Sequence, residues 1–106
     1  MIRKCFRMTL KKGRFNEYKK KHDEVWPEIS AALTNAGVTN YSIYFDKKDN
    51  TLIEYMELKE NNTFENLEEL EILKKWNIYM EALLETKSDN DAVPVVNELE
   101  EVFHHI

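Results

Sequence analysis

The chain has 106 residues, enough for one domain and not comfortably enough for two. Its formal net charge is −5, and it has no basic stripe with interleaved aromatic residues, so nucleic acid is not an expected partner. No apolar run approaches the length of a membrane span, and no secretory leader is visible. The single cysteine, Cys5, cannot form an internal disulfide and has no metal-ligand spacing around it. We therefore expect a cytoplasmic domain without membrane attachment.

Residues 2–10 predict a half-buried strand, because apolar and polar side chains alternate along them. The side chains expected on the apolar face are Ile2, Phe6, Met8 and Leu10, with Lys4 as the exception. Cys5 falls on the other face, where it packs as a small hydrophobic residue. Residues 11–13 are the turn that follows.

A helical period begins at Arg14, and apolar residues recur at intervals of three and four as far as Ala36. Pro27 interrupts this run, because proline lacks an amide donor and disfavours helical geometry in the residue before it. We therefore expect two helical segments, with a break or kink just before Pro27 and with Pro27 in the first turn of the second. Gly37 fits a left-handed stop after the second segment.

Two alternating segments follow, at residues 38–46 and 51–58, with a short polar turn between them. Together they predict an antiparallel hairpin. In the second strand, one face is expected to carry Leu52, Met56 and Leu58.

The last part of the chain predicts one more helix and one more strand. Apolar residues at helical spacing run from Phe64 to about residue 85, and Asn62 followed by Glu65 is typical of a capped helix start. The other expected elements are a polar loop at 86–91, an extended segment at 92–96 and a strand at 99–106.

The predicted order is strand–helix–strand–strand–helix–strand, the split βαβ pattern of α+β, ferredoxin-like domains. We expect one domain over residues 1–106, with an antiparallel sheet and helices on one of its faces. A chain of this length has no third helix for the other face. Pairing of two sheets in a homodimer, as in dimeric α/β-barrel assemblies, is the simplest way to cover that face.

His22 is the residue that most directly suggests chemistry. At helical spacing it lies one turn after Tyr18 and one turn before Trp26, so its imidazole is predicted between two aromatic rings on a core-facing stripe. A group that titrates near neutrality in such a place suits acid–base work on a ring-shaped, weakly polar substrate. The structural alternative is a core histidine with a satisfied hydrogen bond.

Further aromatic residues come from elements whose ends can converge in this fold. They are Tyr18, Trp26, Tyr41, Tyr44, Trp76 and Tyr79. Such rings offer flat faces to the C–H side of a sugar and polar groups to its oxygens. The alternative is that Trp26 and Trp76 anchor the helices on the sheet. A metal site is a weaker alternative, because His22, His104 and His105 lack the spacing of metal ligands.

Five groups of residues occur in this order: Met1-Ile2-Arg3-Lys4-x-Phe6, Glu17-Tyr18-x-x-x-His22-x-x-x-Trp26-Pro27-Glu28, Asn40-Tyr41-Ser42-Ile43-Tyr44, Trp76-x-x-Tyr79-Met80 and Glu98-Leu99-x-Glu101-Val102-Phe103. Taken together, they closely resemble the L-rhamnose mutarotase family from end to end. The resemblance implies a dimeric ferredoxin-like fold that interconverts the α and β anomers of L-rhamnose with no metal or organic cofactor.

By position, the resemblance implies that His22 is the proton donor. The sugar-binding residues that it implies are Tyr18, Tyr41 and Trp76. The family often has a second tryptophan directly after Trp76, where this chain has Asn77, and this leaves the preferred deoxy sugar open. We expect Asn77 and Trp26 to complete the substrate contacts.

Anomer exchange requires the ring oxygen to gain a proton while the anomeric hydroxyl loses one. His22 is assigned as the acid at the ring oxygen, and general acid–base catalysis contributes about 10²–10⁴-fold. The group that removes the anomeric proton is not visible in the sequence. Two other functions stay open: a small monooxygenase-like enzyme of the dimeric α/β-barrel type, and a sugar-binding module without turnover. The ending His104-His105-Ile106 departs from the family, and its role is also open.

Overall fold

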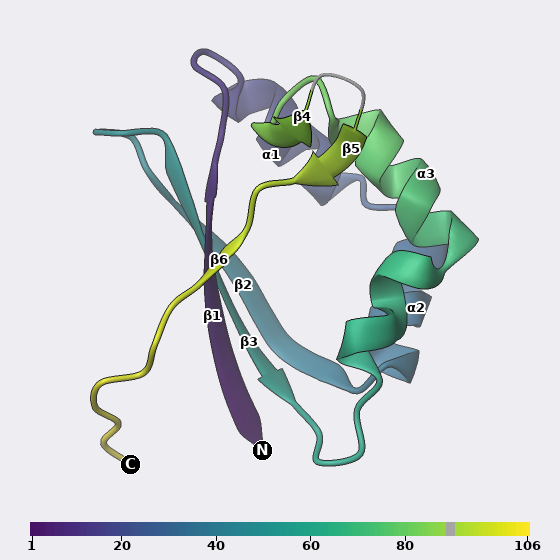
Figure 1. Ribbon diagram of the computed structural model, residues 1–106, viewed down its shortest axis with the longest axis vertical. Helices are drawn as coiled ribbons and strands as arrows, with labels where there is room; N and C mark the ends of the chain where they lie inside the picture. Colours follow the sequence, from purple (N-terminus) through teal and green to yellow (C-terminus); the bar gives the residue numbers. More distant parts are fainter. Residues whose placement is uncertain (89–90) are drawn as a thin grey trace.

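The computed structural model describes residues 1–88 and 91–106. Its elements are β1 (Ile2–Thr9), α1 (Phe15–Asp23), α2 (Pro27–Asn35), β2 (Val38–Asp46), β3 (Thr51–Leu58), the 3₁₀ helix η1 (Phe64–Glu69), α3 (Glu71–Met80), β4 (Thr86–Ser88), β5 (Asp91–Pro94) and β6 (Asn97–Glu98). An antiparallel four-stranded sheet forms one layer, and the helices lie together on one of its faces (Figure 1).

The sheet has the strand order β2-β3-β1-β6. Strand β1 lies inside the sheet, between β3 and β6, and pairs antiparallel with both. This is the order expected of a ferredoxin-like α+β domain, so the predicted fold class is confirmed. Strands β4 and β5 form a separate two-stranded sheet.

The break between the first two helices lies where the sequence predicts it. Helix α1 ends at Asp23 and α2 begins at Pro27, while Trp26 between them has extended geometry with ψ of 136°. Gly37 has the left-handed φ of 88° that ends α2. A Cβ atom there would lie 3.1 Å from the Asn62 Cβ, so both the backbone geometry and the close approach favour glycine.

The single helix predicted from Phe64 to about residue 85 is wrong. The chain instead forms η1, leaves helical geometry at Leu70 with ψ of 133°, and re-enters it in α3, which ends at Met80. The cap is also different, because Asn62 accepts a hydrogen bond from the Phe64 amide and makes no capping box. Leu67 of η1 packs in one core cluster and Met80 of α3 packs in the other. The break at Leu70 allows the two helices to reach these separate clusters.

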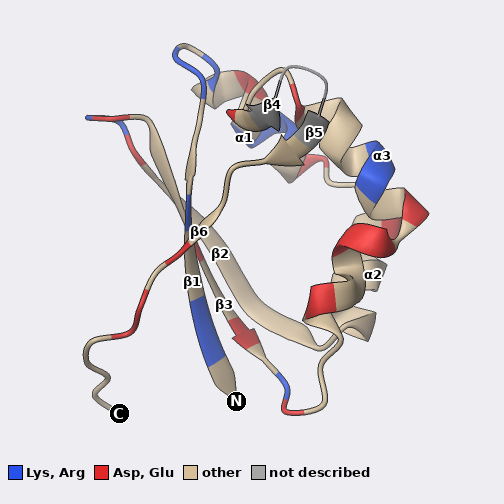
Figure 2. Cartoon of the chain, viewed as in Figure 1, with Lys and Arg blue, Asp and Glu red and all other residues tan. Residues whose placement is uncertain are grey.

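The strand predicted over residues 99–106 is also wrong. The last strand is β6, which has only two residues and pairs with Phe6 and Arg7 of β1. The Leu99 amide still donates to the Cys5 carbonyl, after which the chain runs on without regular structure (Figure 1). Two ion pairs, Arg3–Glu101 at 2.9 Å and Lys4–Glu98 at 3.1 Å, hold this segment against β1. Figure 2 shows the basic stretch of β1 and the acidic start of the C-terminal segment.

The segment between α3 and β6 differs in part from its prediction. The polar loop expected at residues 86–91 contains β4 and the start of β5, and residues 89–90 of that prediction lie outside the described residues. The extended segment expected at residues 92–96 is partly strand, in β5. Within the described part of the chain, no helix has the length and apolar character needed to cross a bilayer.

The core lies between the sheet and the helices, and it is built from two clusters. One cluster joins Met8 and Leu52 of the sheet to Trp76 and Met80 of α3, and the other lies around Phe6. The predicted apolar face of β3 is confirmed, because Leu52, Met56 and Leu58 are all buried. Glu54 occupies the remaining position of that face and is only 8% exposed. A carboxylate therefore lies inside the core.

Candidate active site

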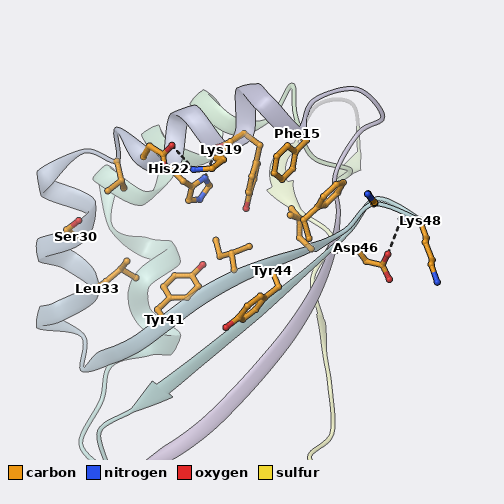
Figure 3. A pocket seen from close by; sticks show the side chains of 16 residues that line it. Phe15, Lys19, His22, Ser30, Leu33, Tyr41, Tyr44, Asp46 and Lys48 are labelled. Carbon is orange, nitrogen blue, oxygen red and sulfur yellow. Dashed lines mark hydrogen bonds and ion pairs between the residues drawn. The ribbon is translucent and has the colours of Figure 1, made fainter.

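A pocket of about 920 Å³ opens between α1, α2 and the β2–β3 hairpin (Figure 3). Most of its walls are apolar, and a few polar groups converge on it. Its lining residues are Phe15, Tyr18, Lys19, His22, Asp23, Val25, Ser30, Leu33, Tyr41, Ile43, Tyr44, Phe45, Asp46, Lys47, Lys48 and Leu52. Apolar walls with few polar side chains are typical of small-molecule sites.

His22 extends from α1 toward this pocket and faces Tyr41, which lies across it on β2 (Figure 3). Its ring lies 4.3 Å from the Tyr18 ring, measured between centroids, because residues four apart stack on one helix face. The second aromatic neighbour is Trp76, edge-on at 5.6 Å. The predicted neighbour on this side, Trp26, is not on the same helix, because α1 ends at Asp23. Two rings thus flank the imidazole, but one comes from α3.

The hydrogen bonding of His22 fixes which nitrogen can act on a ligand. Nδ1 lies 3.1 Å from the Tyr18 carbonyl oxygen. Because a carbonyl only accepts, Nδ1 carries the proton and donates it, which leaves the lone pair of the neutral ring on Nε2. Burial lowers the pKa of His22, and the Tyr18 carbonyl and Asp23 partly oppose this effect. The neutral ring with a free Nε2 is therefore the form favoured at neutral pH.

Glu54 is the functional candidate that sequence reasoning missed. It is buried on β3 and accepts a hydrogen bond from the Tyr41 hydroxyl, which lines the pocket. Burial raises the pKa of the Glu54 carboxyl, and the Tyr41 hydrogen bond opposes this in part. Among the described residues it has no ion pair. One signal was available in the sequence, since Glu54 is the only charged residue at the alternating positions 52, 54, 56 and 58.

Both pocket tyrosines remain protonated phenols. Burial, and then the charge of Glu54, raises the pKa of Tyr18. The same two causes, together with the hydrogen bond to Glu54, raise the pKa of Tyr41. Tyr41 is hydrogen-bonded to Glu54, and both tyrosines line the same pocket. Two hydroxyl groups and an imidazole thus converge on one apolar pocket.

The other predicted site residues, Trp26, Trp76 and Asn77, do not line this pocket. Trp76 is buried and packs edge-on against Trp26 at 5.0 Å, and both rings contact Tyr79. Asn77 is half-buried on α3, directly after Trp76. Three of the six predicted residues, Tyr18, His22 and Tyr41, thus line the pocket. Trp76 contacts His22 and Trp26 contacts Trp76 behind that lining, so their predicted sugar contacts stay a prediction.

The C-terminal histidines lie away from this pocket. His104 lines a second groove with residues of β1, and its Nδ1 atom lies 3.9 Å from the Glu101 carboxylate. His105 is exposed. Among the side chains that the structure describes, no three His, Cys, Asp or Glu residues form a metal-binding group.

The fold and the pocket define a small ferredoxin-like domain with titratable side chains beside an apolar pocket. A family model described as L-rhamnose mutarotase matches residues 3–105. The L-rhamnose mutarotase of Lactiplantibacillus plantarum is 42% identical over 104 residues, which cover 98% of each chain. The crystal structure of the L-rhamnose mutarotase from Formosa agariphila matches all of both chains with a TM-score of 0.87 and 37% identity.

These matches show that the chain belongs to the L-rhamnose mutarotase family. The resemblance in the sequence motifs is thereby confirmed. A dimeric ferredoxin-like protein from an uncultured marine organism is 16% identical, with a TM-score of 0.56 over 96% of each chain. This more distant similarity shows a shared fold alone.

Proposed function

We propose that the chain interconverts the α and β anomers of L-rhamnose or a related deoxy sugar, bound in the pocket beside His22. The observation that carries the proposal is that the His22 imidazole borders a cavity of about 920 Å³ and keeps Nε2 unbonded within the described residues. A core histidine with a purely structural role has no need of such a cavity. Family membership supports the reaction and the sugar class.

His22 acts at the ring oxygen in this proposal. Its Nε2 atom delivers a proton as the bond between C1 and the ring oxygen breaks, and it takes that proton back when the ring closes on the other face of the aldehyde. The environment that lowers the pKa of His22 makes its protonated form a stronger acid. Such catalysis contributes about 10²–10⁴-fold, which suffices for a reaction that also proceeds in water.

The sugar contacts follow from the lining of the pocket. The hydroxyls of Tyr18 and Tyr41 pair with sugar oxygens, and apolar side chains such as Ile43 and Phe45 meet the methyl group and the C–H face of a deoxy sugar. Trp76 holds the imidazole edge-on rather than touching the sugar. Trp26 and Asn77 make no sugar contact in this proposal, because they do not line the pocket.

The test is exchange spectroscopy on the anomers of L-rhamnose, with L-fucose as a comparison sugar. We expect the wild-type chain to accelerate exchange and His22→Ala to lose about 10²-fold or more of that acceleration. His105→Ala, at an exposed histidine, is the matched control and should keep the wild-type rate. Unchanged exchange in His22→Ala would reject the role of His22. Saturable sugar binding without exchange would instead indicate a binding module.

We further propose a cytoplasmic homodimer whose second copy covers the outer face of the sheet. The C-terminal segment leaves Val102 and Phe103 exposed, at 95% and 82%, so apolar side chains lie without intrachain packing next to that face. Light scattering after size exclusion should give twice the chain mass. Val102→Asp with Phe103→Asp should shift the chain toward monomer, and a wild-type monomer at micromolar concentration would reject the dimer.

A further inference from the structure

Glu54 lies in a position that is unfavourable for a carboxylate. Its strand neighbours across the sheet are Phe6 of β1 and Ile43 of β2, and its own face of β3 carries Leu52 and Met56. No cation pairs with it among the described residues. Burial of a charge without a cation is costly, and a neutral amide would accept the same hydrogen bond from Tyr41. The fold therefore does not require a carboxylate here.

The hydrogen bond between Tyr41 and Glu54 has a direction that matters for the pocket. The Tyr41 hydroxyl donates its proton to Glu54 Oε2. Its oxygen is then left with lone pairs that can accept a proton or hydrogen bond from a ligand, because Tyr41 also lines the pocket. Glu54 itself does not line the pocket. The hydrogen bond from Tyr41 is therefore the route by which a proton can pass between a bound sugar and Glu54.

We propose that Glu54 is the positioning residue that makes Tyr41 the base for the anomeric hydroxyl, opposite His22. The proposal rests on the proposed mutarotase function and deepens it, because it supplies the second proton acceptor that anomer exchange requires. His22 and the Tyr41–Glu54 pair then form two ends of one proton path. His22 projects from α1 and Tyr41 from β2 (Figure 3). In this proposal the sugar lies between them.

The step balances without a further reactant. The anomeric hydroxyl gives its proton to the Tyr41 oxygen while Tyr41 passes its own proton to Glu54. The freed O–H electron pair forms the carbonyl, and the C1–ring oxygen bond breaks with its pair moving to the ring oxygen, which takes a proton from His22. Ring closure on the other face reverses every transfer. One proton is thus shared between His22 and Glu54 throughout the cycle.

Several titratable or charged groups face the pocket or this path. They are Tyr18, Lys19, His22 and Asp23 of α1, Tyr41, Tyr44 and Asp46 of β2, Lys47 and Lys48 of the turn, and Glu54 of β3. The unprotonated Glu54 carboxylate and the protonated His22 ring are both needed to open the sugar. The exchange rate should therefore fall on the acid side as Glu54 becomes protonated, and on the basic side as His22 loses its proton.

The decisive variant is Glu54→Gln, which keeps an acceptor for Tyr41 but cannot take its proton. Its exchange rate should fall about 10²-fold, while the sugar concentration that gives half-saturation stays unchanged. The decrease in rate at acid pH that is expected of the wild type should disappear. Tyr41→Phe should lose a similar factor, and the double variant should be no slower than either single variant. Glu54→Asp, which restores a carboxylate, should recover part of the rate.

The relay would be overturned if Glu54→Gln exchanged anomers at the wild-type rate and its rate still fell at acid pH as in the wild type. The proposed function would remain intact. The relay would also be overturned if the fold-loss in rate of the double variant equalled the product of the two single-variant losses, because the two residues would then act independently. If Glu54→Gln does not fold, full activity with an unaltered pH profile in Tyr41→Phe overturns the relay on its own. Absence of exchange in the wild-type chain would overturn the proposed function, and the relay with it.

Discussion

The two sides of the pocket are built in different ways. The helix side is α1, where Tyr18 and His22 lie four residues apart and stack by the geometry of the helix alone. The sheet side is β2 and β3, where Tyr41 lies at a register irregularity between Thr39 and Ser42 and meets Glu54 across the strand pair. The helix side carries the imidazole of His22, which ordinarily titrates near neutrality. The sheet side carries the Glu54 carboxylate, which accepts a hydrogen bond from the Tyr41 hydroxyl.

The difference shows what each side contributes to an acid–base site. Burial lowers the pKa of His22 and raises that of Glu54, so the same apolar surroundings bring the two groups closer in proton affinity. Groups of similar affinity exchange a proton at low cost, which suits a reaction that transfers protons in both directions. Burial thus shifts the pKa values of the two groups toward each other.

The largest expected effect comes from removing the support of the helix side. Trp76→Ala deletes a buried ring and should cost about 3–5 kcal/mol of unfolding free energy. Water reaching the vacated space should also raise the pKa of His22 back toward 6.5, because burial is what lowers it. Chemical denaturation and an NMR titration of the imidazole measure the two effects.

Trp76→Phe is the matched control for that substitution, since it keeps an aromatic edge against the imidazole. It should lose less stability and leave the titration of His22 closer to that of the wild type. A Trp76→Ala chain in which His22 still titrates as in the wild type would show that α1 alone sets the histidine's environment.

The sheet side is expected to show a smaller effect of opposite sign. Glu54→Gln removes a buried charge without a cation partner and should stabilise the chain by about 2 kcal/mol at pH 8. The folded state holds the Glu54 proton more tightly than the unfolded state, whose pKa is near 4.5. Wild-type stability therefore falls as pH rises above that value, and the gain from Glu54→Gln should vanish below it. Urea unfolding at several pH values measures this.

His22 provides the internal contrast for this prediction. Its folded-state pKa lies below 6.5, so the unfolded chain binds the proton more readily and stability falls as pH drops below that value. The free energy of unfolding therefore decreases with rising pH because of Glu54 and with falling pH because of His22. A Glu54→Gln chain no more stable than the wild type at pH 8 would mean that the Tyr41 hydrogen bond fully offsets the burial of the carboxylate.

The same contrast explains what the sequence could predict. The helical spacing of Tyr18, His22 and Trp26 placed the imidazole among aromatic rings, and the position of Pro27 predicted where α1 and α2 separate. Hydrophobic periodicity predicts which residues are neighbours within one helix or strand, so the helix side of the pocket could be predicted from the sequence. The ring beside His22 is Trp76 and not the predicted Trp26, because α3 packs against α1. The pattern within one helix cannot predict such a contact between helices.

The missed features share one cause, which is that they depend on partners far apart in the sequence. Glu54 meets Tyr41 across a strand pair, and the break at Leu70 lets η1 and α3 reach two separate core clusters. The two-residue length of β6 also follows from pairing with β1 rather than from its own pattern. The apolar periods of these segments are compatible with longer elements, and tertiary contacts shortened them.

The smallest expected effect concerns the outer layer of the helix side. Lys21 of α1 donates to the Tyr79 carbonyl at 2.8 Å and lies 4.0 Å from the centre of the Tyr79 ring. Lys21→Met keeps the apolar stem and removes the charge, so it should cost about 0.5–1 kcal/mol. The titration of His22 and the rate of anomer exchange should not change, because Lys21 does not line the pocket. Lys20→Met, at an exposed neighbour, is the control. A shifted His22 titration in Lys21→Met would show that the docking of α1 on α3, and not burial alone, sets the proton affinity of the imidazole.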